Sequence, residues 1–183
     1  MKKWIFGSFV GAVIVFAWQS SSWTFLGIHK DSFKHHPDQE NIISNLSSTF
    51  NEDSAYMIPN LKPGYSQKEY KEFMKQLEGK PWATIIYHSS YKDNMLSNMI
   101  RGFLVSFVLV LLLVIILTKG GLPNFYGFFT GSLAVGVFTF LWGPYSGHIW
   151  FDLPWHMIRG DIIDAIAAWG LCGAWLGWWM NKK

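Results

Sequence analysis

The residues best suited to chemistry in this 183-residue chain are six histidines and a few acids and arginines near them. Three of these side chains, His148, Asp152 and His156, follow one another at intervals of four residues. On an unbroken helix this spacing places two imidazoles and a carboxylate along one stripe, and imidazole is a common ligand of zinc, copper and iron. We therefore consider four residues as candidate ligands of a metal or haem: His29, His148, Asp152 and His156.

Pro154 weakens this pattern, because proline lacks a backbone donor and clashes with the preceding helical turn. If a helix begins at or just before Pro154, His148 and Asp152 lie in a loop. The single cysteine, Cys172, lies in an apolar run, which excludes an intramolecular disulfide and a cysteine-based zinc site. A metal site is therefore an alternative hypothesis for this chain.

A second group of ionisable residues borders a long apolar segment near the C-terminus. Asp161 suits the first turn of a helix as a cap, but Asp164 lies one turn deeper, where a charge in hydrocarbon is costly. We expect Arg101 or Arg159 to pair with Asp164, and Ser20 to Ser22 to add hydrogen bonds. Both a structural and a functional use of Asp164 stay open. The expected polar pocket consists of Trp18, Gln19, Arg101, Arg159, Asp161 and Asp164.

The elements that must position these residues are strongly apolar. Half of the residues are hydrophobic and 18% are aromatic, whereas nine of the twelve acids and eight of the fifteen bases lie between His29 and Asp93. This segregation excludes a disordered chain, an extended nucleic-acid-binding face and a single water-soluble core. Crossing about 30 Å of hydrocarbon takes about 20 residues. Four segments qualify: Trp4 to Phe25, Met99 to Leu117, Leu122 to Leu141 and Ile162 to Trp179.

The orientation of these spans follows from the charges in the short segments. Lys2 and Lys3 make the first segment similar to a secretory signal, but its apolar stretch is longer and no A-x-A site follows, so we expect a retained anchor. Lys119 and Lys182 fall on the same side as Lys2 if the four spans alternate. The positive-inside rule then places both termini in the cytoplasm of a bacterial cell and residues 29–98 in the periplasm or outside.

Residues 29–98 contain signals for a small folded domain. Asp38 and Ser66 are both expected to cap helices, and Ser66 with Glu69 forms a capping-box pattern. Two strands alone are marginal in water, so this domain is expected to lean on the membrane helices, on a second copy or on a partner. The predicted order is helix, strand, helix and strand, over residues 39–50, 55–58, 67–77 and 82–87.

The predicted fold is an all-α membrane protein, a bundle of four transmembrane helices with a small α+β extracytoplasmic domain between helices 1 and 2. Residues 1–28 form helix 1, residues 29–98 the domain, and residues 99–183 helices 2 to 4. The aromatic stretch at 142–160 is expected to be an interfacial loop or half-helix that lies flat on the membrane, or else a lid or ligand platform with Arg159 as an anion contact. Six glycines are expected to allow close helix packing: Gly7, Gly11, Gly127, Gly131, Gly173 and Gly177.

Short motifs spread over most of the chain form a recognisable pattern: Trp18, Trp23, His29, Phe33, Tyr56, Pro59, Gly79 and Pro81. In this pattern the chain resembles an uncharacterised group of small four-span bacterial inner-membrane proteins. In that group a Trp-rich first span runs into a His, followed by an external domain with a Tyr-x-x-Pro strand and three more spans. The resemblance implies the four-span architecture and brings no activity, cofactor or catalytic residue.

Motifs that would indicate an enzyme are missing, including the Walker loop, G-x-S-x-G, H-E-x-x-H and the dinucleotide fingerprint. The sequence therefore favours a non-enzymatic accessory or assembly subunit of a larger membrane complex. The expected partners are membrane lipids and other membrane proteins or further copies of the chain, with no nucleic acid. Two alternatives stay open, namely an external metal, haem or redox-linked site and a small oligomeric channel or lipid-handling protein.

Overall fold

The computed structural model describes residues 2–182 and consists mostly of helices. The chain forms two compact units, a helical unit of Met1–Lys34 with Asn94–Lys183 and a small unit of His35–Asp93. The predicted architecture is confirmed at this level, because the described residues include four helices long and apolar enough to span a membrane and a small two-stranded sheet.

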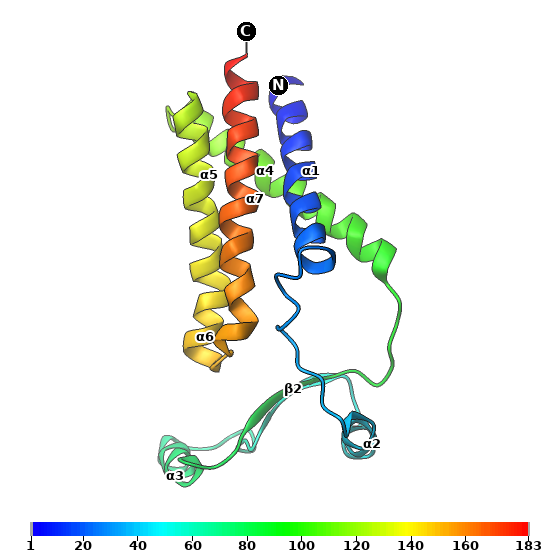
Figure 1. Cartoon of the computed structure of the whole chain (residues 1–183). Helices are drawn as coiled ribbons and strands as arrows, with labels where there is room; N and C mark the ends of the chain where they lie inside the picture. Colours follow the sequence, from blue (N-terminus) through cyan, green and yellow to red (C-terminus); the bar gives the residue numbers. More distant parts are fainter. Residues whose placement is uncertain (1, 183) are drawn as a thin grey trace. The chain divides into compact units, whose positions relative to one another are not determined.

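The helical unit is built from the four long helices in Figure 1. They are α1 (Lys2–Thr24), α4 (Met95–Lys119), a composite helix over Phe125–Phe151, and α7 (Trp155–Asn181). The composite helix starts as α5 (Phe125–Phe140), passes through the π-helical turn η1 (Leu141–Tyr145) and ends as α6 (Ser146–Phe151). One end of this unit contains the last residues of α1, the first residues of α4, and α6. We call it the α6 end.

Of the loop or half-helix expected over 142–160, the structure shows mostly helix. The third helix continues through Trp142 and Pro144 up to Phe151, and α7 resumes at Trp155. In an α-helix, proline removes one hydrogen-bond donor and its ring clashes with a carbonyl of the preceding turn. A π turn is wider than an α-helical turn, so it accommodates Pro144 more easily. The break is confined to residues 152–154, where Asp152 adopts a left-handed conformation with φ of 50°.

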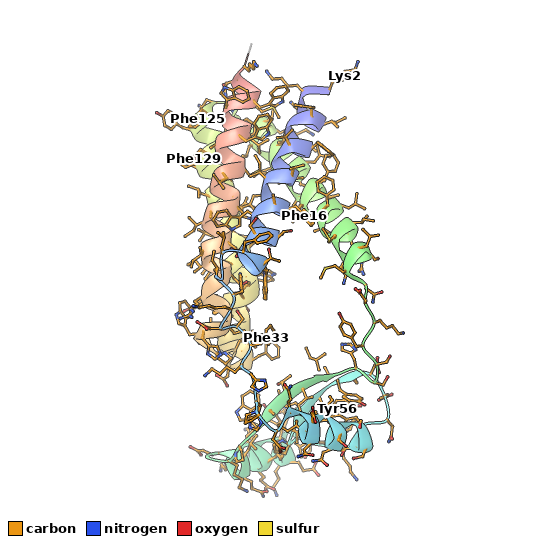
Figure 2. The ribbon with its side chains drawn as sticks, turned by 45° about the vertical axis from the view of Figure 1, so that its right-hand side comes forward. Lys2, Phe16, Phe33, Tyr56, Phe125 and Phe129 are labelled. Atoms are coloured by element: carbon orange, nitrogen blue, oxygen red, sulfur yellow. The ribbon has the colours of Figure 1, made fainter. Side chains whose placement is uncertain are left out.

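α7 packs against both α1 and α5, and α4 packs along α1 at an angle to the other helices (Figure 1). Figure 2 labels Phe16 of α1, whose ring meets Phe103 of α4 edge-on, with 6.0 Å between the ring centres. Between α1 and α7, the indole of Trp175 donates to the carbonyl of Gly7 at 2.9 Å, and Trp179 donates to that of Lys3 at 2.9 Å. Tryptophan N–H groups thus connect the two helices at several levels.

Most of the predicted packing glycines lie where two helices touch. A Cβ added at Gly11 would meet Val110 of α4 and Cys172 of α7 at 2.9 and 3.1 Å. Gly7, Gly131, Gly173 and Gly177 similarly face Trp179, Leu117, Ser132 and Phe125 of other helices. Gly127 differs, because an added Cβ would meet Leu122 in the connection just before its own helix, at 2.6 Å from the carbonyl oxygen. Its small size serves that turn rather than a helix pair.

The small unit has the predicted order of helix, strand, helix and strand. Its elements are α2 (Gln39–Thr49), β1 (Ser54–Ile58), α3 (Gln67–Leu77) and β2 (Ala83–Tyr87). The strands pair antiparallel, from Ser54 opposite Tyr87 to Ile58 opposite Ala83.

The two predicted helix caps of the small unit differ in outcome. The capping box is confirmed, because the Ser66 side chain accepts from the backbone of Glu69 while the Glu69 carboxylate accepts from the backbone of Ser66. The side chain of Asp38 makes no cap bond to α2 and accepts from the side-chain amide of Asn41 instead. Asp38 has φ −98° and ψ 26°, outside the extended conformation in which a capping side chain reaches the helix backbone.

Candidate functional site

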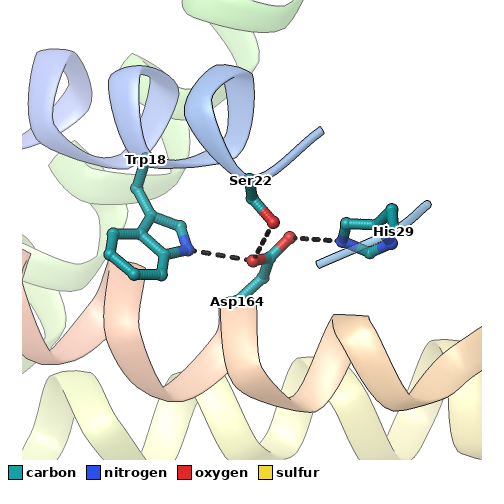
Figure 3. Close-up of polar contacts among 4 residues, drawn as sticks. All are labelled: Trp18, Ser22, His29 and Asp164. Atoms are coloured by element: carbon teal, nitrogen blue, oxygen red, sulfur yellow. Dashed lines mark hydrogen bonds and ion pairs between the residues drawn. The ribbon is translucent and has the colours of Figure 1, made fainter. Parts of the chain in front are cut away.

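The α6 end of the helical unit contains the only buried acid among residues 2–182, Asp164 of α7. Its Oδ1 accepts hydrogen bonds from the indole of Trp18 at 2.9 Å and from the hydroxyl of Ser22 at 2.6 Å. Its Oδ2 lies 2.9 Å from Nε2 of His29 (Figure 3). Because Trp18 and Ser22 are four residues apart on α1, they face α7 from the same side of that helix. One carboxylate therefore gathers three side chains.

His29 reaches Asp164 from the chain segment that follows α1. The helix ends at Thr24, and Gly27 then adopts a left-handed conformation with φ of 64°, which glycine tolerates best. The side chain of His29 is 1% exposed, and its imidazole stacks on the indole of Trp23, with 4.0 Å between the ring centres and 4° between the planes. A Cβ at Gly160 would lie 2.6 Å from Cε1 of His29. The ring position thus requires glycine at this place on α7.

The two ring nitrogens of His29 differ in their surroundings. Nε2 shares a hydrogen bond with Oδ2 of Asp164 at 2.9 Å. Nδ1 of His29 is also buried and has no hydrogen-bond partner among the described residues. Nε2 of His29 and Oδ2 of Asp164 are each other's hydrogen-bond partner, so removal of either residue leaves a polar group of the other without a partner at a low-dielectric position.

A cavity of about 240 Å³ lies directly beside Asp164. Its polar lining comes from Gln19 on α1, Thr139 on α5, and Asp161 and Asp164 on α7, and Trp23 contributes an aromatic wall. The cavity is therefore bounded by three of the four long helices, and its acids lie on one side. Such a volume holds several water molecules or a small polar ligand.

The arrangement does not form a Ser-His-Asp triad, although all three residue types are present. In a triad the imidazole lies between the serine and the acid, so that it removes the hydroxyl proton. Here Asp164 lies between Ser22 and His29, and the Ser22 hydroxyl donates to the carboxylate. The imidazole makes no contact that would activate Ser22 as a nucleophile. The cluster is suited to holding α1, the following segment and α7 together by a buried charge.

The structure brings together only part of the predicted polar pocket. Trp18 binds Asp164, while Gln19 and Asp161 share the cavity with it. The predicted arginine partner of Asp164 is wrong, because His29 takes that position. Arg101 lies on α4, whose starting end is inclined away from α7 (Figure 1), and lines a second cavity.

Arg159 is engaged elsewhere. Its guanidinium donates to Oδ2 of Asp31 at 2.6 Å, and both side chains are about half exposed. Asp31 follows His29 by two residues, so the segment after α1 is attached to α7 at two positions.

The predicted metal ligands are not gathered at one place. His148 of α6 lies with Nδ1 2.6 Å from the carbonyl of Leu153, Asp152 lies in the break between helices, and His156 lies in the first turn of α7. The break at 152–154 separates the residues that a continuous helix would have aligned. Within residues 2–182, no three His, Cys, Asp or Glu side chains are placed to hold one metal ion.

The sequence pattern predicts His29 as a metal ligand and does not indicate its pairing with Asp164. The position of the two residues along the chain could have indicated this pairing. His29 follows the first span and Asp164 lies near the start of the fourth, so both belong to the same end of a four-helix bundle. The stacking of Trp23 and the need for glycine at 160 had no signal in the sequence, since both depend on how α1 meets α7.

Similarity to known proteins assigns no role to this cluster. No protein-family model, curated protein or solved structure matches the chain. A role for the chain has to come from its own geometry.

Proposed function

We propose that this chain is an integral membrane protein of four spans that acts as a non-enzymatic accessory or assembly subunit of a larger membrane complex. The small unit, His35–Asp93, is the part that binds the partner protein. One observation carries the proposal: Tyr87 is the only buried residue of that unit, while many of its apolar side chains are exposed.

The sheet of the small unit has one covered face and one open face. On the covered face, Phe50 stacks on Tyr56 with 4.0 Å between the ring centres, and also contacts Tyr87. On the open face, Ile86 is 72% exposed and Met57 is 43% exposed. Apolar side chains that gather on an open sheet face are a common mark of protein interaction sites.

Both edges of this sheet are also unpaired within the described residues, because β1 and β2 pair only with each other. An isolated pair of strands is marginally stable in water, and an extended segment of another protein can pair with a free strand edge. The same unit exposes Ile42 and Ile43 on α2 and Tyr70 and Met74 on α3. These features support a unit that is completed by a partner.

The helical unit supports membrane insertion through its exposed apolar side chains. Leu104, Val108, Leu112 and Ile116 of α4 are each 49% exposed or more. Such side chains are expected in contact with lipid and are unfavourable in water. The start of α1, with Lys2 and Lys3, and the end of α4, at Lys119, lie at the end opposite to α6 (Figure 1). The positive-inside rule places this end in the cytoplasm and the small unit on the other side of a bacterial inner membrane.

Purification from the native host in mild detergent, with a removable tag that contains no histidine, tests the subunit role. We expect other membrane proteins to co-purify in fixed ratio and Ile86→Lys to reduce their amount at least fivefold. Tyr91→Lys is the matched control, since Tyr91 is 92% exposed but lies outside the sheet. A wild-type protein that isolates only as itself, or only as a homo-oligomer, would contradict the proposal.

Membrane insertion and orientation need a separate test. Carbonate extraction should leave the chain in the membrane fraction. A membrane-impermeant maleimide added to intact cells should label Ser47→Cys in α2 and should not label Lys119→Cys in a background where Cys172 is replaced by Ala. Labelling of both positions or of Lys119→Cys alone would overturn the proposed orientation.

A further inference from the structure

A second cavity, of about 510 Å³, forms a groove between α1, α4, α5 and α7. Its lining includes Val15 and Gln19 of α1, Arg101 and Leu109 of α4, and Trp169 of α7. The groove exists because α4 packs along α1 but is inclined away from α5 and α7 at its starting end (Figure 1).

The groove is polar at one end and apolar at the other. α1 and α4 run in opposite directions, so that Gln19 near the end of α1 belongs with Asn98 and Arg101 near the start of α4. Val15 and Leu109 lie further along the two helices. Leu109 follows Arg101 by eight residues, which corresponds to about 12 Å of helix. The polar end of the groove lies at the α6 end of the unit. From there the groove runs along α1 and α4 to the level of Val15 and Leu109.

Arg101 differs from Arg159 in its electrostatic environment. Arg159 pairs with Asp31, whereas Arg101 forms no ion pair with an acid in residues 2–182. An arginine at the edge of a hydrocarbon layer is costly without an anion, and the planar guanidinium is suited to binding two phosphate oxygens at once. The polar end of the groove therefore has a cation that lacks a protein partner.

We infer that this groove binds one anionic phospholipid, with the phosphate at Arg101 and one acyl chain along Val105 and Leu109. Asn98 and Gln19 are placed at the same end to donate hydrogen bonds to headgroup oxygens. The buried hydroxyl of Ser106 does not compete, since it donates to the carbonyl of Gly102 at 3.0 Å. The inference rests on the membrane insertion proposed above and does not depend on a protein partner.

The test uses native mass spectrometry of the full chain in detergent, with phosphatidylglycerol and phosphatidylcholine as probes. We expect tighter binding of phosphatidylglycerol and a loss of about tenfold in its affinity in Arg101→Gln, since a hydrogen bond to a charged group contributes about 1.5 kcal/mol. Arg101→Lys should retain part of this affinity. Arg159→Gln removes the same charge outside the groove and should leave the affinity within twofold.

A second variant tests the acyl chain separately from the headgroup. Val105→Trp leaves Arg101 intact and fills the groove, so it should weaken phosphatidylglycerol and leave any binding of inorganic phosphate unchanged. Equal binding of the two lipids that Arg101→Gln does not alter would overturn the inference. Full competition by inorganic phosphate, or a cross-link from Val105→Cys to another protein chain, would overturn it too. Release of the chain from the membrane by carbonate would instead overturn the membrane insertion on which the inference rests.

Discussion

The helical unit and the small unit use polar side chains in opposite ways. In the helical unit, Asp164 is buried and its oxygens accept from Trp18, Ser22 and His29. In the small unit, the comparable carboxylates of Asp53 and Glu69 are exposed and bind neighbouring serines. A buried charge has no water to replace a lost partner, whereas an exposed one does. The same bond types should therefore differ strongly in their effect on stability.

The largest effect is expected for Asp164→Ala. This change leaves His29 buried without its partner and should lower the free energy of unfolding by about 3 to 5 kcal/mol. Thermal unfolding in detergent measures it, and Asp161→Asn is the matched control one turn away. His29→Phe combined with Asp164→Leu should recover much of the loss, because neither buried polar group is then left without its partner. If Asp164→Ala unfolds like the wild type, the buried pair does not hold the unit together.

A smaller loss is expected for Gly160→Ala. The added methyl group overlaps the imidazole of His29, whose Cε1 would be 2.6 Å away, so the ring has to leave its place between Trp23 and α7. Overpacking of this kind costs about 1 to 3 kcal/mol. Gly143→Ala is the control, since nothing lies within 4 Å of the position that its methyl group would take. Equal behaviour of the two variants would show that His29 does not occupy this site.

In the small unit, Ser66→Ala should cost about 1 kcal/mol, the usual contribution of a helix cap. Hydrogen exchange of the amides in α3 measures the local loss, and Ser47→Ala in α2 is the control because its hydroxyl only bonds back to the carbonyl of Ser44. A destabilisation as large as that of Asp164→Ala would remove the contrast between the two units.

The smallest effect concerns pH. The side-chain and backbone hydrogen bonds from Ser89 lower the pKa of Asp53 below its ordinary value. A lowered pKa in the folded state stabilises the fold above the unfolded pKa, about 3.9, and this stabilisation is lost as the pH falls through the folded value. Ser89→Ala should raise the pKa of Asp53 in an NMR titration, and Ser90→Ala should not. An unchanged pKa in Ser89→Ala would refute this assignment.

Local structure was largely predictable from the sequence. The four apolar helices, the order of elements in the small unit and the capping box of Ser66 and Glu69 were all predicted correctly. Each depends on residues close in the chain, through hydrophobic length, periodicity or a cap three residues away. The continuous helix through Pro144 was missed, because a π turn gives no clear sequence signal.

The sequence by itself determined that Asp164 lies where a charge needs a partner, and it predicted Arg101 or Arg159 as that partner. Only the tertiary structure decided that His29 pairs with Asp164, that Arg159 pairs with Asp31 and that Arg101 faces a groove. The two pairings join residues more than a hundred positions apart and depend on the turn at Gly27. The groove at Arg101 depends on the angle at which α4 meets the bundle. Hydrophobic burial sets which helices form, but it is non-directional, so packing decides which polar side chain becomes the partner of Asp164.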